Sequence, residues 1–301
     1  MKVKFFRTKV EYPSDMLGEL RDSNGLLNDI SALKSRIEQD GYLLFRNFIE
    51  RDTVLKAREA IVGHMDDNNA LVKGKPLLEA VMPRTGKEVT MTGKSVITHH
   101  PSSLELFENG KLFDFFRLFF GEEAVTYDYK WLRAVGNENF TGCHYDVVYM
   151  GRGSHNVHTV WIPIGEIPVR QGTLAICEGS HNLESFSRLR NTYGGIDVDR
   201  DMISEGWFSS DPYEITEKFG GRWLTANFNP GDILIFGLYT LHASTTNLTD
   251  KFRISCDIRF QPKGEKMDER WAGKNPMGHY AWGKNERKER PITELRKEWG
   301  I

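Results

Sequence analysis

An imidazole and a carboxylate lie two residues apart at His144 and Asp146, in a segment whose composition predicts a β-strand. Because side chains alternate faces along a strand, both groups would project to the same side. His242 follows about 100 residues later, on a second predicted strand. Two imidazoles and one carboxylate are the donors of a facial triad, which leaves three positions of an octahedral iron(II) open. We therefore predict a metal site at His144, Asp146 and His242.

Each part of this pattern is weak by itself. Most His-x-Asp triplets are surface or hydrogen-bonded pairs, and a lone histidine such as His242 is more often a core residue. The same three donors would also suit a zinc hydrolase that uses a metal-bound water. A non-catalytic jelly-roll protein that binds a metabolite is a further alternative.

A further group of polar residues lies on the predicted strand that begins at Arg253. Its polar residues, Arg253, Ser255, Asp257 and Arg259, alternate with apolar ones and so share one face. An arginine on an interior face must meet an anion, because an unpaired buried charge is costly. Its guanidinium matches a carboxylate through two parallel hydrogen bonds. The anion is either an internal partner such as Asp257 or a carboxylate ligand bound beside the metal.

Several segments together resemble the phytanoyl-CoA dioxygenase-like family of iron(II)/2-oxoglutarate oxygenases. They are Asp40 to Phe48, Cys143 to Asp146, Gly172 to His181, Pro230 to Asp232, His242 to Ser244 and Arg253 to Ser255. The resemblance spans roughly residues 30 to 262. It implies that His144, Asp146 and His242 bind Fe(II), and that Arg253 binds the distal carboxylate of 2-oxoglutarate.

The resemblance also implies further contacts of the cosubstrate. Ser244 and Ser255 would supply hydroxyl donors, and Trp161 would pack beside 2-oxoglutarate. Arg133 is a candidate for an additional contact, with a surface arginine as the alternative. In enzymes of this kind O₂ and 2-oxoglutarate are consumed, succinate and CO₂ are released, and a C–H bond of a small molecule is oxidised. Related halogenases lack the carboxylate ligand, so the presence of Asp146 favours hydroxylation or desaturation.

Composition and charge narrow the class of partner. The chain has 301 residues, 39% of them hydrophobic, which suffices for one large core. Its 40 basic and 42 acidic side chains nearly cancel, whereas nucleic acids and membrane surfaces require a concentrated positive field. Cys143, Cys177 and Cys256 are too widely spaced for a disulfide framework, and no apolar run has the length of a signal or a membrane span. We expect a cytoplasmic protein that acts on a small polar or amphipathic molecule. A monomer and a homodimer are both open alternatives for its oligomeric state.

The elements that would position these residues are short. Helical spacing predicts three helices: one over 30–40, one that follows an N-cap at Asp52, and one over 112–120. Gly41 and Gly121 are expected to end the first and the third. Beyond residue 124 the expected strands are 125–135, 144–150, 157–164, 173–177, 223–228, 232–236, 240–245 and 253–260. This series predicts a mainly β fold with flanking helices, namely a double-stranded β-helix (jelly roll) with N-terminal helices packed on one sheet.

The chain reads as a single jelly-roll oxygenase domain over 1–301. Its expected parts are a helical N-terminal part over roughly 1–121, a β core over roughly 122–262 and a C-terminal tail over roughly 263–301. A polar segment over roughly 183–222 interrupts the strands and is predicted to be an inserted lid. Pro291 is predicted to be the first residue of a last short helix.

Overall fold

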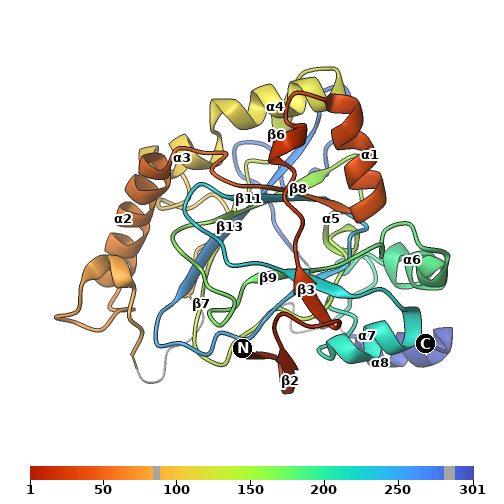
Figure 1. Cartoon of the computed structure of the whole chain (residues 1–301). Coiled ribbons are helices and arrows are strands. Elements are labelled where there is room, and N and C mark those ends of the chain that lie inside the picture. Colours follow the sequence, from red (N-terminus) through yellow and green to blue (C-terminus); the bar gives the residue numbers. More distant parts are fainter. Residues whose placement is uncertain (84–88, 281–288) are drawn as a thin grey trace.

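The computed structural model describes residues 1–83, 89–280 and 289–301, and two β-sheets form its centre (Figure 1). The larger sheet has the strand order β4 (Tyr42–Phe45), β11 (Ile233–Gly237), β8 (His158–Pro163), β13 (Arg253–Pro262), β7 (Trp131–Val135) and β5 (Val89–Thr90), with β6 (Ala124–Thr126) also paired to β13. The smaller has the order β12 (His242–Ser244), β9 (Leu174–Cys177), β10 (Trp223–Thr225) and β3 (Leu17–Glu19). A hairpin of β1 (Lys2–Phe5) and β2 (Thr8–Glu11) begins the chain. The predicted mainly β jelly roll is confirmed.

Apolar side chains from both sheets meet between them. Leu44, Trp161 and Leu234 come from the larger sheet, and Ile176 and Leu224 from the smaller one; all belong to one buried cluster. Burial of this kind is the main favourable contribution to folding. This packing fixes the separation of the two inner faces, and the predicted metal ligands lie between the same two faces.

Four helices cover the other face of the larger sheet. They are α1 (Ile30–Asp40), α2 (Arg51–Asp67), α3 (Pro101–Phe107) and α4 (Gly110–Phe120). Their apolar residues form one buried cluster with Ile254, Cys256 and Ile258 of β13. The ring of Phe116 stacks on Phe260 with centroids 4.6 Å apart. The apolar residues of β13 thus face the helices, so the strand's polar residues face the interior of the jelly roll.

The helix ends agree with the predictions in two cases and differ in one. Gly41 and Gly121 end α1 and α4 in the left-handed conformation, with φ of 84° and 80°, which a glycine adopts without a steric penalty. Asp52 is not the N-cap: that position is taken by Glu50, two residues earlier, and Asp52 lies in the first turn of α2. A carboxylate in that turn still interacts favourably with the positive end of the helix dipole.

The predicted strand over 125–135 is divided into β6 and β7. The two halves pair with different parts of β13, around Phe260 and around Ser255. Between them the backbone N–H of Tyr129 donates to Trp271 in the C-terminal tail, at 3.1 Å. The strand is interrupted because this segment bonds to the tail, an interaction that local composition does not reveal.

The segment over 183–222 and the C-terminal tail pack against each other. The segment contains η3 (Glu184–Phe186), α6 (Ser187–Asn191), η4 (Tyr193–Gly195) and α7 (Pro212–Phe219), and the tail ends in α8 (Ile292–Trp299), one residue after the predicted start at Pro291. Arg270 of the tail is fully buried and lies 2.5 Å from carboxylate oxygens of both Asp199 and Asp268. This network ties the two segments together.

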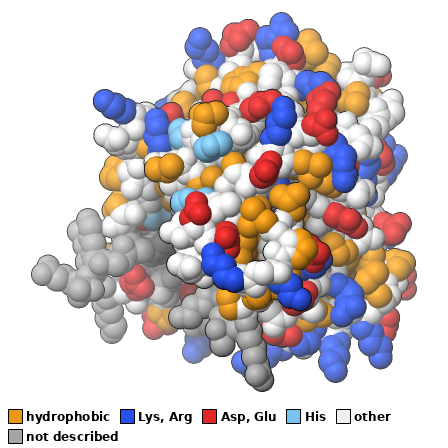
Figure 2. All heavy atoms as spheres, turned by 90° about the vertical axis from the view of Figure 1, so that its left-hand side faces the viewer, with side chains coloured by type: hydrophobic (Ala, Val, Ile, Leu, Met, Phe, Trp, Pro, Cys, Tyr) orange, Lys and Arg blue, Asp and Glu red, His pale blue; other side chains and the backbone are white. Residues whose placement is uncertain are grey.

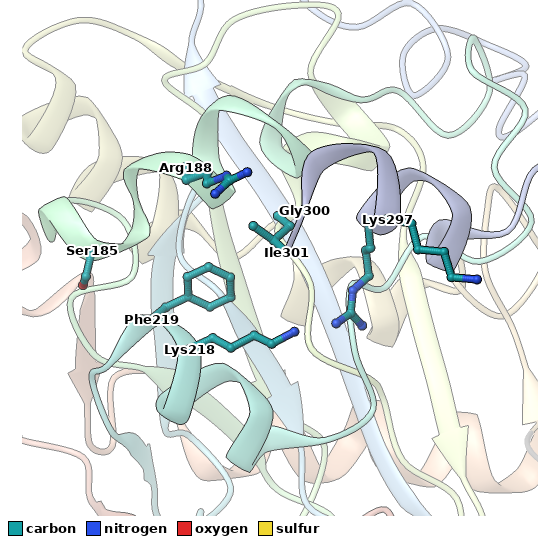
Figure 3. Close-up of a pocket in the computed structure, with 8 residues that line it drawn as sticks. Ser185, Arg188, Lys218, Phe219, Lys297, Gly300 and Ile301 are labelled. Carbon is teal, nitrogen blue, oxygen red and sulfur yellow. The ribbon is translucent and has the colours of Figure 1, made fainter.

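A cavity of about 560 Å³ lies between α6, α7 and α8, with Arg188, Phe219 and Ile301 in its wall (Figure 3). It contains none of the residues predicted to do chemistry. On the molecular face shown in Figure 2, acidic and basic side chains are interspersed. Within residues 1–83, 89–280 and 289–301, no helix has both the length and the apolar character needed to cross a membrane.

Candidate metal centre

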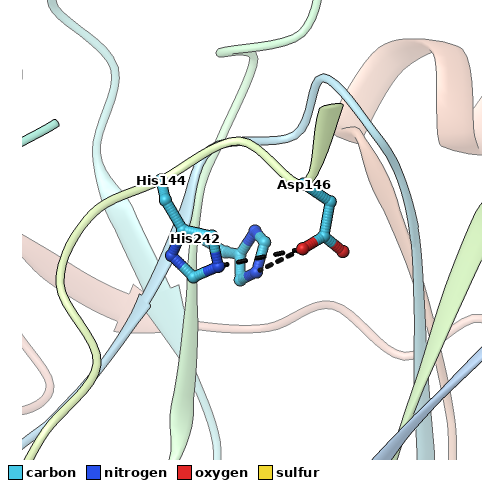
Figure 4. Close-up of side chains that lie close together, drawn as sticks. All are labelled: His144, Asp146 and His242. Atoms are coloured by element: carbon cyan, nitrogen blue, oxygen red, sulfur yellow. Dashed lines mark ion pairs between the residues drawn. The ribbon is translucent and has the colours of Figure 1, made fainter. Parts of the chain in front are cut away.

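The structure brings the three predicted metal ligands together in the interior (Figure 4). Asp146 Oδ1 lies 3.8 Å from the Nε2 atoms of both His144 and His242. Asp146 is 2% exposed, His144 8% and His242 5%. Cis ligand atoms that are each about 2.1 Å from an octahedral ion lie about 3 Å apart. The three side chains are thus near enough to share one ion once their ligand atoms move together by under about 1 Å.

The backbone around the ligands differs from the prediction. His144 and His242 form an isolated antiparallel bridge, in which each backbone N–H donates to the other residue's carbonyl, at 2.9 and 3.0 Å. Asp146, however, is not in a strand. Its φ of −65° and ψ of −26° are helical, and it directly precedes the short helix α5 (Val147–Met150). The predicted strand over 144–150 is therefore wrong, because the chain turns immediately after His144; the two side chains nevertheless reach the same point.

Hydrogen bonds orient both imidazoles. His144 Nδ1 donates to the carbonyl of Gly142 at 2.8 Å, and His242 Nδ1 donates to that of Thr240 at 3.0 Å. A carbonyl can only accept, so each Nδ1 carries the proton and each Nε2 keeps its lone pair for a metal. Burial lowers the pKa of His144 to about 3, with a further lowering by the neighbouring His242. Burial also lowers the pKa of His242, so both rings are neutral at pH 7.

The carboxylate of Asp146 is oriented by two donors on its other oxygen. Asp146 Oδ2 accepts from Thr159 Oγ1 at 2.6 Å and from Arg259 Nη2 at 3.1 Å. Burial by itself would raise the pKa of Asp146, but Arg259 and the two imidazoles outweigh it and hold that pKa well below its usual range. The site therefore presents one anionic and two neutral donors, the set that a divalent cation requires.

A cavity of about 500 Å³ opens onto the three ligands and contains most of the other predicted residues in its wall. Arg253 is 4% exposed and lines this cavity, as do Arg133, Trp161 and Ser244. Arg253 Nη1 donates to Ser255 Oγ at 2.5 Å. Ser255 thus orients the guanidinium. A buried guanidinium facing the metal site has the charge and shape to bind a dicarboxylate.

Two of the weaker candidates have internal contacts. Ser244 Oγ accepts from the backbone N–H of Thr141 at 2.7 Å, which ties β12 to the segment leading to His144. Arg133 Nη1 lies 3.0 Å from Asp257 Oδ2. Arg133 also lines the cavity, so its predicted contact with the cosubstrate stays a prediction.

Sequence reasoning missed several residues of this site. Arg259 shares its strand face with Arg253, and the argument that an interior arginine must meet an anion applied to it equally; its anion is Asp146. His279 of the tail also lines the cavity, as do residues 204–207, which belong to the segment that was predicted to be a lid but were not assigned to the site one by one. No periodicity or motif marks these residues, since they lie in irregular segments brought together only by the tertiary fold.

Comparisons with known proteins agree with this geometry. The sequence profile described as phytanoyl-CoA dioxygenase (PhyH) matches residues 37–255. The 1-deoxypentalenic acid 11-beta-hydroxylase of Streptomyces exfoliatus is 26% identical over 277 residues, which cover 83% of this chain and 87% of that protein. The corresponding hydroxylase of Streptomyces arenae is 25% identical over 267 residues, with the same two coverages of 83% and 87%.

Two solved structures share the fold. EctD from S. alaskensis with bound Fe superposes with a TM-score of 0.57 at 15% identity, covering 93% of this chain and 94% of its own. The epimerase SnoN from nogalamycin biosynthesis, in complex with Fe³⁺, alpha ketoglutarate and nogalamycin RO, gives a TM-score of 0.55 at 16% identity, covering 79% and 85%. At these identities the likeness establishes the jelly roll and its connectivity.

Proposed function

The chain belongs to the phytanoyl-CoA dioxygenase family and is an iron(II)- and 2-oxoglutarate-dependent dioxygenase; we propose that it hydroxylates an unactivated C–H bond of a small amphipathic molecule, with His144, Asp146 and His242 as the iron ligands. One observation carries this proposal: Asp146 Oδ1 lies 3.8 Å from both imidazole Nε2 atoms, in a cavity that also contains a buried arginine. Asp146 supplies the carboxylate that related halogenases lack, which supports hydroxylation, or desaturation, over halogenation.

Each group of this chain has a separate task in the proposed reaction. When bound, iron(II) and 2-oxoglutarate supply the oxidative chemistry, with succinate and CO₂ as products. Arg253, oriented by Ser255, binds the distal carboxylate of 2-oxoglutarate. Trp161 packs beside the cosubstrate, and Ser244 and Arg133 are further candidates for polar contacts with it. Residues 204–207 of the inserted segment and His279 of the tail form part of the cavity wall and so limit the access of water to the reacting centre.

The cavity wall suggests the class of substrate. It combines the aromatic side chains of Trp131, Tyr149 and Trp207 with the polar side chains of Ser204 and His279. Such a mixture suits a molecule with an apolar body and a few polar groups. The S. exfoliatus relative is named for hydroxylation of 1-deoxypentalenic acid, which has an acidic group and is a suitable first compound to test.

The proposal is tested by adding 2-oxoglutarate anaerobically to the Fe(II)-loaded protein. We expect a metal-to-ligand charge-transfer absorption in the visible range, and release of succinate once O₂ is admitted. His242→Ala should abolish both signals. Absence of both in folded, iron-loaded wild-type protein would contradict the proposal.

The same donor set would allow a zinc hydrolase. That alternative gives no task to the buried Arg253 and does not agree with the family match. Metal-free protein reloaded with either Fe(II) or Zn(II) distinguishes the two: recovery of 2-oxoglutarate turnover with Fe(II) alone is the expected result. A protein that only binds a metabolite would consume no O₂ under either condition.

A further inference from the structure

The two oxygens of the Asp146 carboxylate have different surroundings. Oδ1 faces both imidazoles, whereas Oδ2 accepts hydrogen bonds from Thr159 and Arg259. We propose that Thr159 and Arg259 are positioning residues that keep Asp146 a ligand through one oxygen only, so that a coordination position stays open for dioxygen. This inference rests on the proposed iron and 2-oxoglutarate chemistry.

The number of coordination positions explains why this constraint matters. An octahedral ion has six positions, of which a facial triad fills three. A 2-oxoglutarate bound through two oxygens would fill two more, which would leave one for O₂. A carboxylate can also bind a metal through both oxygens, as it often does with larger cations. If Asp146 did so here, its second oxygen would occupy the last position and O₂ could not bind.

Both donors come from directly opposite positions of the larger sheet. Thr159 of β8 and Arg259 of β13 are paired residues in the antiparallel register, and both side chains are buried. Directly opposite side chains on one face of an antiparallel pair lie within about 4.5–5.5 Å at Cβ. The two donors are thus held side by side by the strand pairing, behind the carboxylate as viewed from the imidazoles.

The guanidinium of Arg259 is itself held in place. It lies over the ring of Trp131, 4.2 Å from the centroid, and its Nη1 is 3.7 Å from Asp257 Oδ2. Trp131 and Asp257 are paired residues of β7 and β13. A cation placed over an indole ring is attracted by the ring's quadrupole. Arg259 therefore cannot follow a rotation of Asp146 that would bring Oδ2 to the metal.

The geometry differs from that of an ordinary buried ion pair. Arginine and aspartate that pair only with each other commonly align two parallel N–H···O bonds and use both carboxylate oxygens. Arg259 contacts Oδ2 alone and leaves Oδ1 to the metal side. This division indicates a role in directing the ligand beyond neutralising its charge.

The test uses nitric oxide as a surrogate for dioxygen in the anaerobic Fe(II) protein saturated with 2-oxoglutarate. Electron paramagnetic resonance of the high-spin nitrosyl complex reports whether a position is open. We expect Thr159→Val/Arg259→Met to retain the 2-oxoglutarate charge-transfer band, but with its maximum displaced, and to bind nitric oxide about tenfold or more weakly. Thr159→Ser should restore the affinity that Thr159→Val lowers.

Matched controls separate this role from general damage. Thr225 is also fully buried, and its hydroxyl donates to the carbonyl of Leu174; Thr225→Val should leave both signals unchanged. The single variant Thr159→Val keeps the size of the side chain, so it decides the question if the double variant does not fold. Wild-type nitric oxide affinity in iron-loaded Thr159→Val and in the double variant would overturn the inference. Wild-type protein without the 2-oxoglutarate band would instead refute the proposed function.

Discussion

The rings of Trp207 and Phe140 lie parallel, with centroids 5.6 Å apart and an angle of 3° between their planes. Trp207 belongs to the inserted segment, and Phe140 to the segment that leads to His144. A backbone bridge at Cys143 and Ser209 joins the same two segments: the N–H of Cys143 donates to the carbonyl of Ser209 at 2.7 Å, and the N–H of Phe208 donates to the carbonyl of Cys143 at 2.8 Å. We infer that this part of the insert is a fixed wall of the cavity, connected to a metal ligand, rather than a freely moving flap.

The contact between Trp207 and Gly142 gives the first prediction. A Cβ atom at Gly142 would lie 2.4 Å from Trp207 Cε3, which is too close for any carbon pair. Gly142→Ala should therefore displace the indole and lower the free energy of unfolding by about 1–3 kcal/mol. Urea unfolding measures this change. Trp207→Ala in the same chain should relieve most of the clash, and equal losses in Gly142→Ala with and without Trp207 would contradict this explanation.

Arg253 should act on the cosubstrate and not on the metal. Removing a charged hydrogen-bonding partner of a carboxylate costs about 1.5–3 kcal/mol. Arg253→Ala should therefore raise the dissociation constant for 2-oxoglutarate by roughly tenfold to hundredfold, with Fe(II) affinity nearly unchanged. Titration of the charge-transfer band measures the first quantity, and competition with an Fe(II) chelator measures the second. Equal loss of both affinities would show that Arg253 supports the metal site instead.

His158 gives a prediction on pH dependence that is independent of the metal. Its ring lies among those of Phe116, Phe119 and Phe120, with centroids 5.3–6.1 Å apart. Burial lowers the pKa of His158 from 6.5 to about 4. Between these values the unfolded chain binds a proton that the folded chain does not, so stability present above pH 6.5 is lost as the pH falls toward 4.

The corresponding variant is His158→Phe. The slope of the unfolding free energy of the metal-free protein against pH should decrease by up to about 1.4 kcal/mol per pH unit in this window. His144 and His242 contribute slopes of the same sign and remain in the variant, so the slope should decrease without vanishing. Urea unfolding at a series of pH values measures it. An unchanged slope would mean that His158 titrates normally in the folded protein.

The buried Arg270 should be essential for joining the insert to the tail. Breaking a buried ion pair by removing one partner commonly costs about 3–5 kcal/mol, because the other charge stays buried and unpaired. Arg270→Met removes the cation that lies between Asp199 and Asp268, while Asp199 keeps its contacts with His279 and with the backbone N–H of Tyr280. The variant should lower the free energy of unfolding by about 3 kcal/mol. Arg200→Ala, at an exposed pair with Asp201, is the control and should change it by less than about 1 kcal/mol. A similar small effect for both variants would contradict the prediction.

The strength of local signals decided how much could be predicted from the sequence. The alternation of polar and apolar residues along β13 predicted correctly which of its residues face the interior, since a strand has a strict period of two. Gly41 and Gly121 likewise ended helices as expected. Asp146 was placed on the correct side, but for a wrong reason, since the chain turns after His144 and does not continue as a strand. In this turn the N–H of Val147 donates to the carbonyl of Leu238 at 3.1 Å. Leu238 lies far along the chain, so the local sequence does not reveal the turn.

The rest of the site could not be predicted, for the same physical reason. His279 and Trp207 lie in segments without periodicity, and their place in the cavity wall depends on buried contacts such as that between Arg270 and Asp199. Arg259 could have been assigned: the cost of an unpaired interior charge demanded an anion for it, and Asp146 was already a candidate. Pairing two predicted residues by charge would have identified this contact.

The mutual backbone hydrogen bonds between His144 and His242 set the separation of their imidazoles without help from any ion. Removal of the metal by a chelator should therefore leave the two imidazoles at the same separation. We therefore expect Fe(II) added to the metal-free protein to restore the 2-oxoglutarate charge-transfer band without a refolding step.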